Sequence, residues 1–96
     1  MLEELGRTPE EVADALRAAG IKGVRNTVRF LNPVVRYVHT LLTDVYGIDL
    51  IRGDRLRIVF ANGREQEVVV PEPVLRFLDD FHRGRYPDLE MHPDPG

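Results

Sequence analysis

The sequence predicts a small α+β domain: two or three helices, then a three-stranded antiparallel meander, then a closing helix. Two observations support this fold class. Apolar residues recur at helical spacing before residue 46, alternate with a period of two from 48 to 70, and return to helical spacing from 73 to 83. No helical segment separates the predicted strands, so short turns must join them and neighbouring strands must run antiparallel.

The first helix is predicted at residues 9–19. Thr8 before Pro9 is typical of an N-cap followed by a first-turn proline, and Glu11 completes a capping box. Gly20 suits the left-handed position that ends a helix. The apolar positions on one face of this helix are Val12, Ala15, Leu16 and Ala19.

Residues 22–31 leave two alternatives, a short helix over 24–31 or an ordered loop. Helical apolar spacing favours the first, and three residues of low helix propensity favour the second: Gly23, Asn26 and Thr27. Asn32 then predicts the N-cap of a helix at 33–46, closed by Gly47. Its expected core stripe is Val34, Val38, Leu41, Leu42 and Val45.

Strands are expected at 48–51, 55–60 and 65–70, joined by turns at Gly53 and at Asn62-Gly63. A two-residue second turn would place Ile58 opposite Glu67. Three-residue loops with glycine in the left-handed conformation instead align apolar with apolar and charged with charged side chains, which favours that register. One face of the sheet would then carry Leu50, Leu56 and Val68, and the other a charge ladder of Asp49, Arg57 and Glu67.

The last helix is predicted at 73–83 and stopped by Gly84. Its core stripe is Val74, Phe77, Leu78 and Phe81. Residues 1–90 are expected to form a single globular domain, because 96 residues leave room for only one, and 91–96 a flexible tail.

The residue inventory argues against an enzyme. The chain contains no Cys and no Ser, which removes two common nucleophiles and all disulfide and thiolate chemistry. His82 and His92 lack the spacing of metal ligands, and Asp79 and Asp80 point in different directions on a helix. We therefore expect no catalytic residue, no metal site and no cofactor. With no long apolar run, no membrane partner is expected either, and a cytoplasmic location is the default.

Three stretches resemble a family of small actinobacterial proteins: TPEEVADALRAAGIKG at 8–23, PVVRYV at 33–38 and VPEPVLRFLDDFHRGRYPDL at 70–89. The resemblance covers most of the chain in order. It implies a shared fold and brings no assigned activity. Relatives of this kind often carry a Cys before the proline where this chain has Asn32, so no thiol-dependent role transfers to it.

Charge is distributed unevenly along the chain. The net charge of −3 divides into −3 for residues 1–20, +5 for 21–64 and −5 for 65–96. A basic central segment between two acidic segments, in a chain without catalytic groups, predicts a protein-interaction or regulatory adaptor module. The partner could also be a second copy of the chain, which would form a homo-oligomer. The alternative is a winged-helix-like DNA-binding protein that uses helix 33–46 and the hairpin tip near Arg64. Under either hypothesis the expected contact residues are Arg25, Arg29, Arg36 and Arg64.

Overall fold

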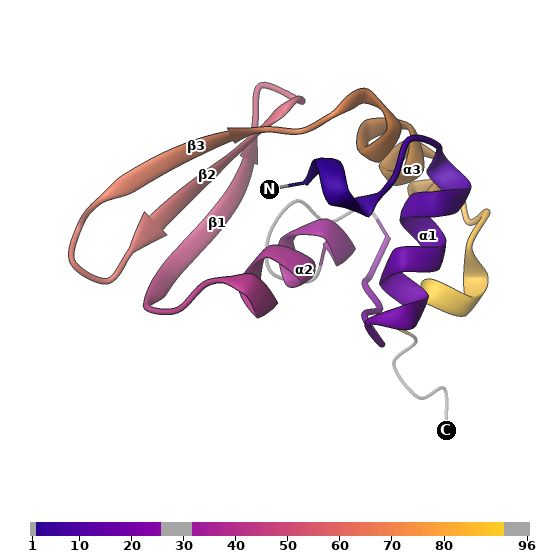
Figure 1. Ribbon diagram of the computed structural model, residues 1–96, viewed down its shortest axis with the longest axis horizontal. Helices are drawn as coiled ribbons and strands as arrows, with labels where there is room; N and C mark the ends of the chain where they lie inside the picture. Colours follow the sequence, from indigo (N-terminus) through magenta and orange to yellow (C-terminus); the bar gives the residue numbers. More distant parts are fainter. Residues whose placement is uncertain (1, 26–31, 92–96) are drawn as a thin grey trace.

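The computed structural model describes residues 2–25 and 32–91 of the chain. A three-stranded antiparallel sheet extends to one side of a group of helices (Figure 1). The helices precede and follow the strands in the predicted order, so the α+β class is confirmed. Residues 26–31 lie outside the described residues, and with them most of the segment for which a short helix and a loop were both considered.

The helical elements begin largely where the sequence predicts. Their bounds are η1 Glu3–Leu5, α1 Pro9–Ala18, α2 Pro33–Leu41, α3 Glu72–His82 and η2 Pro87–Leu89. The Thr8 hydroxyl accepts a hydrogen bond from the Glu11 amide at 3.2 Å, which confirms the predicted cap. The Glu11 carboxylate in turn accepts a hydrogen bond from the Arg7 amide at 3.1 Å. In an ordinary capping box the donor would be the amide of the N-cap residue itself, Thr8.

The second helix is shorter than predicted, because α2 ends at Leu41 rather than at residue 46. Leu42 is already extended, and Gly47, expected to stop the helix, lies inside the first strand. Val45 and Tyr46 have high strand propensity, and Val45 pairs with Phe60 of the second strand, which favours the start of a strand here over a further helical turn. As a result Leu41, expected in the core, is 47% exposed.

The sheet confirms the predicted register. Its strands are β1 Val45–Ile51, β2 Arg55–Phe60 and β3 Glu65–Val69, in the order β1-β2-β3. Leu50, Leu56 and Val68 lie opposite one another across the three strands. The neighbouring set of cross-strand partners is Asp49, Arg57 and Glu67. Gly63 has a φ of 88° at the third position of its loop, as a three-residue loop requires. In the first loop, two successive residues have positive φ, Arg52 at 53° and Gly53 at 77°.

The charge ladder pairs diagonally rather than straight across the strands. Arg57 Nε lies 3.6 Å from a Glu65 carboxylate oxygen, and Arg55 lies 3.9 Å from Glu67. Both pairs are about half exposed, so we expect each to contribute less than about 1 kcal/mol. The register is therefore determined mainly by the turns and the apolar row.

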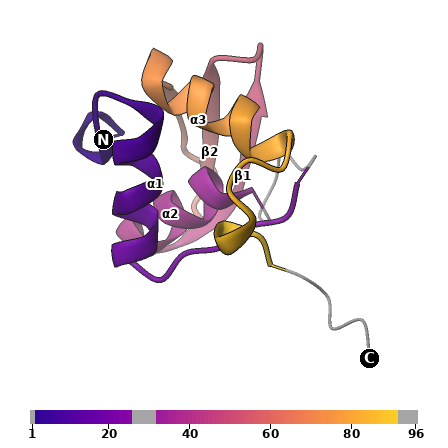
Figure 2. The ribbon, with the colours of Figure 1, turned by 90° about the vertical axis from the view of Figure 1, so that its right-hand side faces the viewer.

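The core lies between the helices and one face of the sheet. Helices α1 and α3 pack against each other, and α2 contacts β1 (Figure 2). The largest fully buried side chains include Phe77 and Phe81 from α3, Leu16 from α1, and Leu56 and Ile58 from β2. The sheet face that carries the charge ladder is turned away from this core.

The C-terminal segment docks onto the residues that follow α1. The Gly23 amide donates to the Leu89 carbonyl oxygen at 2.9 Å, and the Met91 amide donates to the Gly23 carbonyl oxygen at 2.7 Å. Met91, the first residue of the predicted tail, is thus bound to the domain by its backbone. Residues 92–96, the remainder of that predicted tail, lie outside the described residues.

Tyr37 connects α2 to η1, and this contact predicts a change of stability at high pH. Its hydroxyl donates to a Glu4 carboxylate oxygen at 2.9 Å. Burial, and then the hydrogen bond to Glu4, raise the pKa of Tyr37 to about 12 from the ordinary 10.0. Since the folded-state pKa is the higher one, the neutral phenol contributes stability that is complete below about pH 10 and is lost as the pH rises toward 12.

We therefore expect Tyr37→Phe to make the alkaline loss of unfolding free energy shallower than in the wild type. Urea denaturation at several pH values between about 9 and 12 measures this. Tyr46→Phe serves as the control, because Tyr46 is 83% exposed, and it should leave the alkaline loss unchanged. Equal pH profiles for Tyr37→Phe and the wild type would contradict the prediction.

Candidate binding surface

The structure does not bring the predicted contact arginines together. Arg25 lies beside the C-terminal segment, where its Nε is 2.9 Å from a Glu90 carboxylate oxygen. The Glu90 side chain is only 9% exposed, so Arg25 compensates a nearly buried charge. Arg36 lies on α2, with a guanidinium nitrogen 3.5 Å from the Met91 sulfur. Arg64 lies in the turn between β2 and β3, and Arg29 lies outside the described residues.

Part of the central positive charge is neutralised by the acidic C-terminal third. The ion pairs are Arg25 with Glu90, Arg55 with Glu67 and Arg57 with Glu65. Within residues 2–25 and 32–91, Arg36, Arg52 and Arg64 have no acidic partner. Arg52 and Arg64 occupy the turns at opposite ends of β2, roughly 20 Å apart for a strand of this length. These arginines do not form the continuous basic stripe that follows a phosphate backbone.

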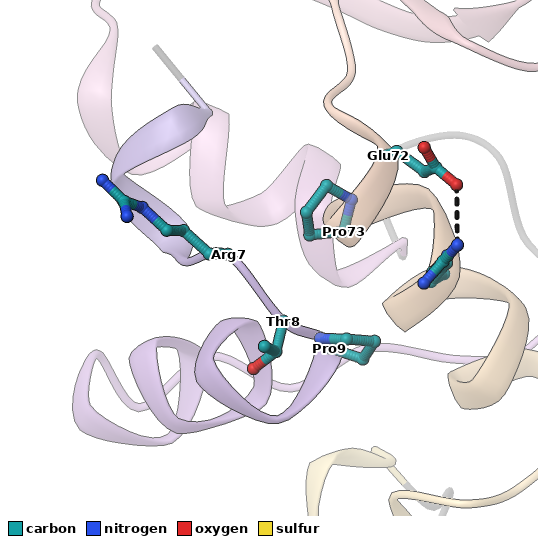
Figure 3. A pocket seen from close by; sticks show the side chains of 6 residues that line it. Arg7, Thr8, Pro9, Glu72 and Pro73 are labelled. Atoms are coloured by element: carbon teal, nitrogen blue, oxygen red, sulfur yellow. Dashed lines mark hydrogen bonds and ion pairs between the residues drawn. The ribbon is translucent and has the colours of Figure 1, made fainter.

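One pocket of about 280 Å³ lies between the N-terminal ends of α1 and α3. Its lining residues are Arg7, Thr8, Pro9, Glu72, Pro73 and Arg76 (Figure 3). Glu72 and Arg76 form an ion pair at 2.9 Å, and the Thr8 hydroxyl already caps α1. Figure 3 shows Arg7 directed away from that pair. The polar groups here are largely used by the fold itself.

A pocket of about 420 Å³ lies beside Arg36 on the exposed side of α2. It is lined by Ile21, Arg36, His39 and Thr40. The Thr40 hydroxyl donates to the Tyr37 carbonyl oxygen at 2.6 Å, which uses its proton within the helix. Thr43, which lies within the predicted helix 33–46, follows the end of α2 in the structure. This surface therefore lacks the array of polar side chains expected of a DNA recognition helix.

A pocket of about 410 Å³ lies at the far end of the sheet, where the β2–β3 hairpin extends past α2 (Figure 1). We call it the hairpin-end pocket. Its lining residues are Thr43, Asp44, Phe60, Ala61, Asn62, Arg64 and Gln66. Gln66 is exposed although its cross-strand partner Ile58 is fully buried. The helical layer thus stops short of this end of the sheet, and the pocket occupies the uncovered part.

Two opposite charges line the hairpin-end pocket without forming an ion pair with each other. No charged partner of the Asp44 carboxylate or of the Arg64 guanidinium occurs in the described part of the chain. Their backbones are nevertheless fixed: the Ala61 amide donates to the Asp44 carbonyl oxygen at 2.8 Å. The Arg64 amide donates to the Asn62 side-chain oxygen at 3.0 Å. The pocket therefore presents one acidic and one basic group from ordered backbone positions.

Two exposed apolar side chains flank Asp44 in the chain. Tyr46 is 83% exposed, and Leu41 is 47% exposed. The pairing of β1 with β2 skips one residue between Val45 and Gly47, so Tyr46 is the extra residue of a β-bulge. Bulges redirect side chains, and this one accompanies an aromatic ring that projects into solvent. We refer to the pocket lining together with Leu41 and Tyr46 as the hairpin-end surface.

Among the residues of the hairpin-end surface, only Arg64 is one of the contact residues predicted from the sequence. Asp44 and Tyr46 were missed because both were assigned to a helix that ends before them. The sequence does contain part of the evidence for a strand here, because the run from Val45 to Ile51 is rich in residues that favour strands. The positive φ of Asp44, 58°, is a backbone conformation that Asp tolerates better than most residues.

Comparison with protein-family models, with curated proteins and with solved structures finds no match to the chain. No group of three or more metal-ligating side chains occurs in the described residues. None of the helices described is long and apolar enough to cross a membrane.

Proposed function

We propose that this chain is a non-enzymatic module that binds another protein through its hairpin-end surface. The observation that carries the proposal is the pair Asp44 and Arg64, which line one pocket and have no ionic partner among the described residues. Charged groups that a fold leaves unpaired beside a concavity are available to a partner, and opposite charges give such a contact specificity.

The composition of the surface supports a protein partner over a nucleic acid. Interfaces between proteins are enriched in tyrosine and arginine, and Tyr46 and Arg64 both belong to this surface. A phosphate backbone would be attracted by Arg64 and repelled by Asp44.

Site-specific photo-crosslinking in the native host tests this function. A photoreactive amino acid at Gln66, inside the pocket, is expected to form a discrete adduct with a protein. The same probe at the exposed Glu72, on another surface, serves as the positional control. Arg64→Ala should reduce the adduct by about tenfold or more, which is the effect of removing a central charged contact.

Arg52→Ala is the matched control variant. Like Arg64, Arg52 is an exposed turn arginine without an acidic partner in the described residues, and it lies at the other end of β2. It should leave the adduct unchanged. An adduct that is insensitive to Arg64→Ala would overturn the proposal. So would Arg64-dependent binding to random duplex DNA at about 50 mM salt, which the DNA-binding alternative predicts.

A further inference from the structure

We infer that the partner which fits the hairpin-end surface is a second copy of this chain. The inference rests on the proposed function and specifies its partner. In the resulting two-fold dimer, Arg64 of each copy faces Asp44 of the other, and Tyr46 of each copy packs against the opposite hairpin end.

The charges of the surface are complementary to themselves. In a two-fold interface, a contact from residue i to residue j is repeated from j to i, so a patch must match its own rotated image. One unpaired carboxylate and one unpaired guanidinium on the same pocket meet that condition. Facing two such patches produces two Arg64–Asp44 pairs and opposes no like charges at these positions.

The surface also carries the apolar groups that an interface requires. Tyr46 projects from the bulge two residues after Asp44 and is 83% exposed, and Leu41 is 47% exposed. Phe60 lines the pocket and is half-buried. An exposed tyrosine two residues from the pocket residue Asp44, together with Phe60 in the pocket lining, gives each copy both an anchor and a place to receive one. Aromatic anchors in pockets carry most of the binding energy of interfaces.

The edge of β3 is a poorer place for a second copy. The Phe60 amide donates to the Arg64 carbonyl oxygen, so the alternate residues Glu65 and Glu67 direct their backbone groups away from β2. Pairing β3 with another β3 would bring these glutamates close to their copies. Charged residues on an edge strand oppose such pairing, so association is directed to the hairpin end.

Sedimentation equilibrium tests the inference on the full chain. Between about 5 and 500 μM, the range that resolves micromolar dissociation constants, the wild type should shift from monomer to dimer. Arg64→Asp gives each copy two carboxylates and Asp44→Arg gives each copy two guanidinium groups at the paired positions. Each single variant should raise the dimer dissociation constant by about tenfold or more, because like charges then face each other.

Mixing the two variants is the decisive measurement. In a mixed dimer both pairs regain opposite charges, so the equimolar mixture should associate about as tightly as the wild type although each variant alone does not. Circular dichroism of each variant confirms that it is folded. Tyr46→Ser provides a second route, since it removes the anchor without changing a charge and should also weaken the dimer by about tenfold.

The outcomes separate this inference from the proposed function. A wild type that stays monomeric to about 500 μM, together with an Arg64-dependent crosslink to a different protein, overturns the inference and keeps the proposed function. A dimer whose dissociation constant is unchanged in both charge variants also overturns the inference. The inference is also overturned if the equimolar mixture of the two charge variants associates no more tightly than each variant alone. Loss of all Arg64-dependent adducts overturns both.

Discussion

Replacing Phe77 by alanine is expected to lower the free energy of unfolding by about 3–5 kcal/mol. The Phe77 side chain is fully buried and belongs to α3, the helix that packs against α1. Its ring lies 5.9 Å from that of Phe81 and 5.1 Å from that of Tyr86, measured between centroids. Alanine removes the transfer free energy of the ring and leaves a cavity that the close-packed core does not fully refill.

Equilibrium urea denaturation followed by circular dichroism measures this loss. A domain of this size has a total stability of about 5–15 kcal/mol, so the variant should be substantially unfolded on modest warming. Tyr46→Ala, studied at low protein concentration, is the aromatic control and should change stability by less than about 0.5 kcal/mol. A Phe77→Ala loss below about 1 kcal/mol would show that the helices do not pack on this ring.

Gly6→Ala is expected to cost about 2–5 kcal/mol, from backbone strain together with overpacking. Gly6 has a φ of 144°, a region that L-residues rarely adopt. A Cβ atom at this position would lie 2.5 Å from the Cβ of Glu11 and 3.1 Å from the Val12 amide nitrogen. The chain passes this close where η1 packs against α1, whose first turn is fixed by the Thr8 cap.

Gly47→Ala provides the matched control within the same protein. Gly47 lies in β1, and a Cβ atom there would meet no heavy atom within 4 Å. Its φ is not positive, so the substitution should be neutral or stabilise the fold by up to about 1 kcal/mol, through a less flexible unfolded chain. Similar denaturation midpoints for Gly6→Ala and Gly47→Ala would contradict the assignment of strain to Gly6.

The accuracy of the predicted sheet and the error in the second helix have different origins. The register followed from local chemistry, because Gly53 and Gly63 adopt left-handed conformations and set the length of each loop. The end of α2 depended on a competition between helix and strand. Apolar spacing allowed a helical stripe to continue through Leu42 and Val45, but Leu42 adopts an extended backbone and Val45 pairs with Phe60 in the sheet.

The candidate site was accessible to sequence analysis only in part. Arg64 was identified because it stands in a predicted hairpin turn within a basic segment. Arg25 was placed in the same group, yet it compensates the nearly buried Glu90, which lies 65 positions further along the chain. A charged residue's partners are set by distant segments, so sequence alone does not separate a structural arginine from one available for binding.

The sequence by itself determined the fold class, the capped start of α1, the turns and the register of the sheet. Each depends on residues that are neighbours in the chain, where caps, glycine conformation and apolar periodicity act locally. The tertiary structure alone decided which charges remain unpaired and where the helical layer stops short of the sheet. Those features depend on contacts between distant segments, and they bring Asp44 and Arg64 to one pocket beside an exposed tyrosine.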